Sequence, residues 1–159
     1  MSCRIEIVVQ APKNFASSLK NQIKKSAIKT IESIPKIVFL KKTKLIKKGV
    51  ISVAVVGVSE IKSLNLKYRK KNKPTDVLSF SRLDSSPVPF PMVNTDLGDV
   101  LICWKIAKKQ AIKDGVTFRE ELSRLTIHGV LHLFGYDHEI SEADEKKMFR
   151  LQDKILKSL

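Results

Sequence analysis

The chain has few cysteines and no long apolar run, and these shortages exclude several classes of protein. Its two cysteines, Cys3 and Cys103, stand in no CxxC or other metal-ligand spacing. Both lie in apolar, strand-like surroundings, which predicts buried free thiols and fits the reducing cytoplasm. No apolar run approaches the roughly 20 residues that span a bilayer, and the opening MSCRIEIVVQAPK lacks the apolar core of a signal peptide. We therefore expect a cytoplasmic protein without a membrane segment.

Acidic residues are also few. The 159 residues hold 16 Asp and Glu against 30 Lys and Arg, which gives a formal net charge of +14. Such an imbalance predicts a polyanionic partner, of which nucleic acid is the commonest and an anionic membrane surface the competitor. A third interpretation is that lysine is simply the default surface residue of this chain.

Length and hydrophobic patterning predict one α+β domain over residues 1–159. The chain is long enough to bury a core, has 43% hydrophobic residues, and shows no repeat or linker. We expect a mixed four-stranded sheet packed with about five helices. The pattern predicts strands over residues 4–9, 50–56, 77–81 and 98–104, and helices from Asn14 to Pro35, from Ser59 to Tyr68, from Trp104 to Gly115, over 118–134 and from Ser141 to Ile155.

Two segments stay outside the predicted elements. Residues 36–48 are rich in lysine, and they are either part of a surface for a polyanion or a solvated connection. Residues 82–96 contain three prolines and are expected to form a loop.

All three histidines lie in HGVLHLFGYDH, residues 128–138. His128 and His132 are four residues apart, which places both on one face of the helix predicted over residues 118–134. This helix is apolar on most sides and is expected to be buried and central. Gly135 permits a left-handed residue and a chain reversal, so His138 can fold back over the same face at the helix end. Three neutral imidazoles at one point suit Zn²⁺ with an open fourth position, the pattern of catalytic rather than structural zinc sites.

The alternative is that these histidines are hydrogen-bonded core residues. Polar rings in an otherwise apolar helix cost free energy unless they find partners, which favours a bound ion. Gly129 costs about 1 kcal/mol relative to alanine inside a helix, so a close approach is expected there. It also stands where the HExxH metalloproteases carry their glutamate base. Asp137 and Glu139 can orient a ligand, accept a proton or act as turn residues.

The histidine stretch resembles the HGxLHLxGYDH motif of the YbeY family, bacterial rRNA maturation factors described as metal-dependent endoribonucleases. Two further blocks are similar to family segments: LNLKYRKKNKPTDVLSF, residues 64–80, and LGDVLIC, residues 97–103. The resemblance covers roughly residues 50–156, in the family's order and spacing. Ser81 is a departure, because the family often has proline there.

The resemblance implies that His128, His132 and His138 hold one zinc ion per chain and that Arg69 and His132 are catalytic. From the residues alone, Arg69 belongs to a solvated basic run, KYRKKNK, whereas the resemblance makes it a phosphate-binding group near the metal. The segment PTDVLSF is interpreted as architecture that shapes the cleft. RNA phosphates are expected to contact the basic run through Arg69, Lys70, Lys71 and Lys73.

The implied function is zinc-dependent cleavage of single-stranded RNA in rRNA processing and ribosome quality control. Precursors of rRNA and ribosomal particles are the implied partners. Either water or the RNA 2′-hydroxyl would be the nucleophile. Two alternatives stay open: a zincin-like metalloprotease, opposed by Gly129 and the charge of +14, and a non-catalytic ribosome-assembly factor with structural zinc.

Overall fold

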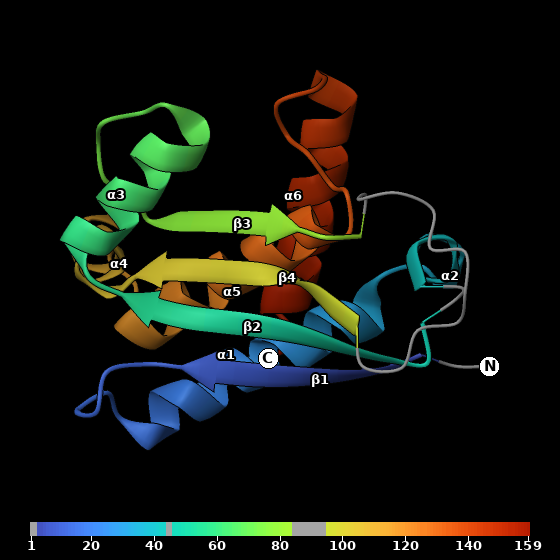
Figure 1. The fold of residues 1–159 in the computed structure, drawn as a ribbon, viewed down its shortest axis with the longest axis horizontal. Helices are drawn as coiled ribbons and strands as arrows, with labels where there is room; N and C mark the ends of the chain where they lie inside the picture. Colours follow the sequence, from blue (N-terminus) through green and yellow to red (C-terminus); the bar gives the residue numbers. More distant parts are fainter. Residues whose placement is uncertain (1–2, 44–45, 84–94) are drawn as a thin grey trace.

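The computed structural model describes residues 3–43, 46–83 and 95–159 and is an α+β fold (Figure 1). Four strands and six helices occur in these residues. Their bounds are β1 (Arg4–Gln10), α1 (Ser17–Ser33), α2 (Lys36–Thr43), β2 (Lys48–Val56), α3 (Val58–Arg69), β3 (Val77–Ser81), β4 (Thr95–Cys103), α4 (Trp104–Asp114), α5 (Phe118–Leu133) and α6 (Glu142–Leu156).

The four strands form one mixed sheet in the order β1-β2-β4-β3. β1 pairs with β2, and β2 with β4, in parallel, while β3 runs antiparallel along the edge of β4. The strand β2 is central, and its residues Ile51 and Val53 are fully buried, which agrees with the β-branched run VISVAVV. The predicted mixed four-stranded sheet is confirmed.

Alternate residues of β4 belong to two different hydrophobic clusters. Val100 and Ile102 join the main core with residues of α1 and α5, which lie behind the sheet in Figure 1. Leu101 packs with Ile61 of α3 in a smaller cluster. Because successive strand residues point to opposite faces, α3 packs on the face away from α5. The predicted burial of the 118–134 helix is also confirmed, since ten of the sixteen residues of α5 are buried.

The lysine-rich segment contains a helix that the sequence does not predict, so the described residues hold six helices where about five were expected. α2 begins directly after Pro35, whose carbonyl accepts hydrogen bonds from the backbone N–H groups of Val38 and Phe39. Phe39 stacks on Phe134 with ring centroids 5.9 Å apart. Tertiary packing of two apolar side chains thus stabilises a helix in a segment for which the sequence predicts no secondary structure.

Several predicted boundaries differ from the structure. α1 starts at Ser17 rather than at Asn14, and Gly57, not Ser59, is the N-cap of α3. β4 starts at Thr95, inside the predicted 82–96 loop. Residues 84–94 of that loop lie outside the described residues.

Both cysteines have free thiols, as expected, but only Cys103 is buried, and Cys3 is partly exposed. Among the described residues, no helix combines the length and the apolar character that a membrane crossing requires.

Candidate metal centre

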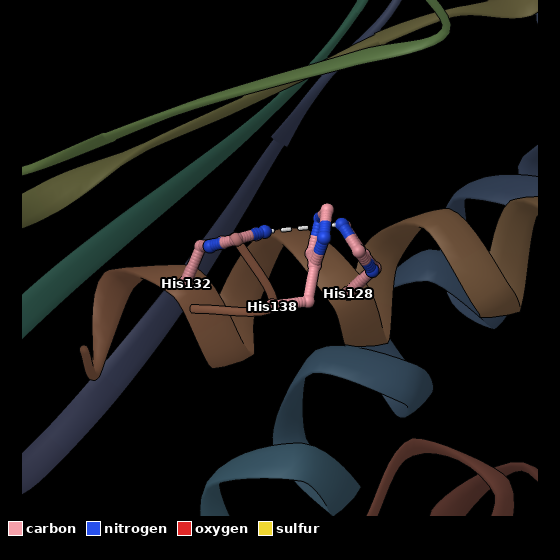
Figure 2. Close-up of side chains that lie close together, drawn as sticks. All are labelled: His128, His132 and His138. Carbon is pink, nitrogen blue, oxygen red and sulfur yellow. Dashed lines mark hydrogen bonds between the residues drawn. The ribbon is translucent and has the colours of Figure 1, made fainter. Parts of the chain in front are cut away.

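The three histidines converge at the C-terminal end of α5. His128 and His132 project from one face of this helix, and His138 returns from the following segment to meet them (Figure 2). Their candidate ligand nitrogens all lie within 4.8 Å of one another. The Nε2 atoms of His128 and His132 are 3.1 Å apart. All three side chains are partly buried, so the cluster is sheltered but open to solvent.

A glycine turn brings His138 back to the helix. Gly135 has a φ of 84°, in the left-handed region that favours glycine. Its N–H donates to the carbonyl of His132, and the N–H of Tyr136 donates to that of Leu131, which closes the helix end. The chain reversal predicted at Gly135 is therefore present, with His138 just beyond it.

Two side chains of α6 hold the imidazoles in place. The Nδ1 atom of His128 lies 3.0 Å from Oε1 of Gln152, a buried residue. Since an amide oxygen only accepts, Nδ1 carries the proton and Nε2 presents its lone pair to the cluster. Phe149 stacks against His128 and His138, with ring centroids 6.3 and 5.6 Å away. α6 thus fixes both the tautomer of His128 and the orientation of two rings.

The surroundings keep the α5 histidines uncharged at neutral pH. Burial lowers the pKa of His128 to about 4; the neighbouring His132 adds to this, and the Gln152 hydrogen bond opposes it. Burial also lowers the pKa of His132, helped by His138 and opposed by the charge of Asp137. Neutral imidazole is the form that binds a metal ion.

The donor set suits a tetrahedral zinc ion. A zinc site with bonds of about 2.05 Å places its ligand atoms about 3.4 Å apart. The 3.1 Å between the Nε2 atoms of His128 and His132 is close to this distance. The contacts of Gln152 and Phe149 leave the ligand nitrogens pointing inward, as a metal site requires.

A cavity of about 200 Å³ opens in front of the histidines, and Arg69 lies at its rim. The guanidinium is exposed, yet its charge contributes to the lowered pKa of His132. Lys70, Lys71 and Lys73 are exposed and do not line the cavity. The structure therefore brings Arg69 to the cluster but leaves the three neighbouring lysines outside it. The lining consists of Arg69, Thr75, Asp76, Val77, Ser79, His128, His132, Asp137, His138 and Glu139.

A comparison with protein families identifies the chain. The model of the family described as Endoribonuclease YbeY matches residues 14–159. The chain belongs to the YbeY endoribonuclease family. This match includes the predicted resemblance of residues 50–156 and extends it into the N-terminal part.

Curated YbeY relatives are similar over about two thirds of their length. The Endoribonuclease YbeY of Persephonella marina is 49% identical over 109 residues, 69% of each chain. That of Staphylococcus aureus is 46% identical over 112 residues, 67% of this chain and 70% of the relative. A solution structure of TM1509 from Thermotoga maritima is 29% identical, with a TM-score of 0.57, and covers 95% of this chain and 87% of that one.

The family segment PTDVLSF forms one wall of the cavity. The Asp76 carboxylate accepts hydrogen bonds from the Thr75 hydroxyl, the Val77 N–H and the Gln110 amide at 2.9–3.0 Å. Burial alone would raise the pKa of Asp76, but these hydrogen bonds outweigh it, so the pKa is lowered. The Arg124 guanidinium lies 3.9 Å away. These contacts agree with the interpretation of the segment as architecture.

Gly129 of the family motif allows α5 to lie close to the sheet. A Cβ atom at this position would come within 2.4 Å of Cγ1 of Val100 and 3.1 Å of the Ser79 hydroxyl. The close approach predicted from this glycine is therefore present. It brings α5 close to β3 and β4, and Ser79 of β3 lines the same cavity as the histidines.

Sequence reasoning missed the supporting residues Gln152, Phe149 and Ser79. Gln152 and Phe149 are three residues apart on α6, which gives them one helix face, but nothing in their types points to histidine partners. Ser79 stands in a strand that reads as core. These residues reach the site only because the tertiary structure places α6 and β3 beside the histidines.

Proposed function

We propose that this chain is a zinc-dependent endoribonuclease that cleaves single-stranded RNA and acts in rRNA maturation and ribosome quality control. The observation that carries the proposal is the shared cavity of three converging imidazoles and Arg69. Membership of the YbeY endoribonuclease family gives the reaction class. The net charge of +14 suits a polyanionic substrate.

His128, His132 and His138 would hold the zinc ion. When bound, zinc supplies a Lewis acid that polarises water or a phosphoryl oxygen. Gln152 keeps the proton of His128 on Nδ1, so that Nε2 stays available as a ligand. Phe149 restrains the rings of His128 and His138 by stacking.

Arg69 would bind the scissile phosphate. A guanidinium forms paired hydrogen bonds to phosphate oxygens and stabilises the charge that develops on them during cleavage. Asp137 and Glu139 line the same cavity and offer carboxylates as proton acceptors. Their exposure differs, since Asp137 is partly buried and Glu139 is exposed. We assign the proton-accepting role to Asp137, because it lines the cavity next to His138 and is the more sheltered of the two.

The basic run would hold RNA next to the cavity. Lys70, Lys71 and Lys73 follow Arg69 in the connection between α3 and β3, and all are exposed. The Asn65 amide donates to the backbone carbonyl of Lys73 at 2.7 Å, which ties this connection to α3. Ammonium groups on a tethered loop suit phosphates of rRNA precursors, read without regard to sequence.

A metalloprotease is disfavoured by the packing at Gly129. The HExxH proteases carry a glutamate base at this position. Here the position faces Val100 at a distance too short for any side chain. This packing opposes the protease alternative independently of the charge.

Cleavage of a labelled single-stranded RNA by the purified, zinc-loaded protein tests the proposal. We expect His132→Ala to abolish cleavage and to lower the zinc content measured by elemental analysis. Arg69→Ala should lower kcat by about 10²–10³-fold with the zinc content unchanged, because one stabilising donor set is lost. Arg69→Lys is the matched control, which keeps the charge but loses the paired geometry. Equal cleavage by wild type and both alanine variants would show that the reaction takes place elsewhere.

A further inference from the structure

A second cavity, of about 550 Å³, is lined mainly by residues of α6. Four of its lining residues are cations, and Tyr136 and Leu151 are among the others. We call this cavity the α6 groove. Its lining consists of Pro35, Tyr136, Ala143, Lys146, Lys147, Arg150, Leu151 and Lys154.

The cations of the α6 groove are available to a ligand. Lys146 pairs with Glu142 one turn before it. Among the described residues, no carboxylate pairs with Lys147, Arg150 or Lys154, and all three are exposed. They stand at i, i+3 and i+7, so they share one face of α6 and cover about 10 Å along it. These three cations therefore form a row without ion pairs among the described residues, and Lys147 lies over the Tyr136 ring, 5.6 Å from its centroid.

Shared residues connect the α6 groove with the histidine cavity. A cavity of about 310 Å³ lies between them. It shares Asp137 with the histidine cavity and both Tyr136 and Lys147 with the α6 groove. The three cavities are therefore neighbours on the surface, in the order histidine cavity, middle cavity and α6 groove.

The middle cavity is more acidic than the α6 groove. Asp137 and Asp144 line it together with Lys147, and carboxylates accept hydrogen bonds, which suits ribose hydroxyls rather than phosphates. The buried Tyr136 hydroxyl has no hydrogen-bond partner among the described residues, and its ring lines both the middle cavity and the α6 groove. Phosphate contacts are therefore expected along the cations of α6, beginning at Lys147, which the two cavities share.

We propose that the α6 groove binds the backbone of the single-stranded RNA outside the cleavage site, with phosphates on Lys147, Arg150 and Lys154. The inference rests on the proposed function and deepens it, because it names where the flanking nucleotides lie. A positively charged groove that follows the backbone is a usual part of surfaces that bind single strands without regard to sequence.

An anionic membrane fits the α6 groove less well than RNA does. A helix that lies on a bilayer inserts an apolar face. The apolar residues Met148 and Ile155 of α6 are buried in the core of the protein. Continuity with the histidine cavity also favours a ligand that the cavity would act on.

Charge removal in a cleavage-deficient background tests the groove. In His132→Ala protein, Lys147→Gln, Arg150→Gln and Lys154→Gln are combined, and anisotropy of a labelled single-stranded RNA is followed across a salt series. We expect affinity to fall by about tenfold or more and the slope of log K against log salt to become shallower by about 2, or about 0.7 per lost phosphate contact. If the triple variant has a lower thermal unfolding midpoint than its parent, the three single variants replace it in the binding test, and each should show part of the effect.

The matched control removes three charges from α4, at the other end of the sheet in Figure 1. Lys108, Lys109 and Lys113 are exposed and line neither the histidine cavity nor the α6 groove. Their triple Gln variant should bind RNA with nearly the affinity of its parent. Equal losses in the α4 and α6 variants would overturn the proposal, since net charge alone would then explain both.

Two further measurements separate this inference from its alternatives. With His132 intact, the α6 variant should raise KM for a long single strand and leave cleavage of a dinucleotide unchanged. If wild type cleaves no RNA, the proposed function is wrong. The anisotropy measurement still shows whether the α6 groove binds RNA. Loss of binding to phosphatidylglycerol vesicles with unchanged RNA binding would instead assign the groove to a membrane and overturn the RNA proposal.

Discussion

At the scale of single residues, the hydrogen bond between His128 and Gln152 is expected to increase the affinity of the site for zinc. Its amide oxygen accepts from Nδ1 of His128 at 3.0 Å and is buried. Gln152→Met keeps the size of the side chain but removes the acceptor, which frees the ring to rotate and to change tautomer. We expect zinc affinity to fall by about 10–100-fold, measured by competition with a chromophoric chelator.

Gln152→Glu is the control for this prediction. A carboxylate also accepts the Nδ1 proton and increases the basicity of the ligand, so zinc affinity should be kept or raised. If the methionine variant binds zinc as tightly as wild type, the hydrogen bond has no part in the site.

Gly129 is the second residue with a predictable effect. Alanine there would place a Cβ atom 2.4 Å from the fully buried Val100, whose branched side chain is stiff. We expect overpacking of about 3 kcal/mol, which exceeds the about 1 kcal/mol gained in helix propensity and lowers the free energy of unfolding.

A double-mutant cycle tests the cause. Val100→Ala creates the space that the new methyl group needs. The double variant should therefore lose less free energy of unfolding than the two single variants lose together, measured by urea unfolding. If the losses of the two single variants simply add in the double variant, the contact with Val100 is not the cause of the destabilisation.

At the scale of elements, the N-terminal cap of α5 stabilises the helix that carries His128 and His132. The Thr117 hydroxyl accepts from the Glu120 N–H at 3.2 Å, and the Glu120 carboxylate accepts from the Thr117 N–H at 2.7 Å. Thr117→Ala should lower the free energy of unfolding by about 1 kcal/mol, and Thr117→Ser should preserve it.

The cap should affect stability without affecting the site. Eleven residues separate Thr117 from His128, or about 16 Å along the helix. Zinc affinity of folded Thr117→Ala protein is therefore expected to equal that of wild type. A drop in affinity would mean that the cap also sets the position of the histidines.

Elements differ in how far sequence predicts them. α5 is predicted well because its long apolar run and its terminal glycine are both local signals. Its capping box at Thr117 is a local signal too, but the prediction did not use it. α2 is missed because it contains many lysines, and because its apolar residues Val38 and Phe39 stabilise the helix only by packing against the core. The start of β4 is also missed, because pairing of Thr95 with Gly49 extends the strand beyond its apolar part.

At the scale of the whole molecule, acid should weaken the contact network around Asp76. Burial raises the pKa of this carboxylate, but its hydrogen bonds outweigh burial and leave the folded-state pKa below the unfolded value of about 3.9. Its stabilisation is thus complete above that value and is lost as the pH falls through the folded pKa. We expect Asp76→Asn to lower the free energy of unfolding by about 1–3 kcal/mol at pH 7.

The pH dependence separates charge from shape in this prediction. The difference between wild type and Asp76→Asn should shrink as the pH falls below about 4, measured by urea unfolding at several pH values. A difference that is constant between pH 7 and pH 3 would show that the charge of Asp76 does not stabilise the fold.

The sequence by itself determined the cluster of His128, His132 and His138, because the three lie within eleven residues and helix geometry with one glycine turn brings them together. Only the tertiary structure decided which groups join them. Arg69, Gln152 and Phe149 come from α3 and α6, and their positions depend on the strand order β1-β2-β4-β3 and on side-chain packing between distant segments. Short-range patterns encode local geometry, whereas long-range contacts follow from how the elements bury one another.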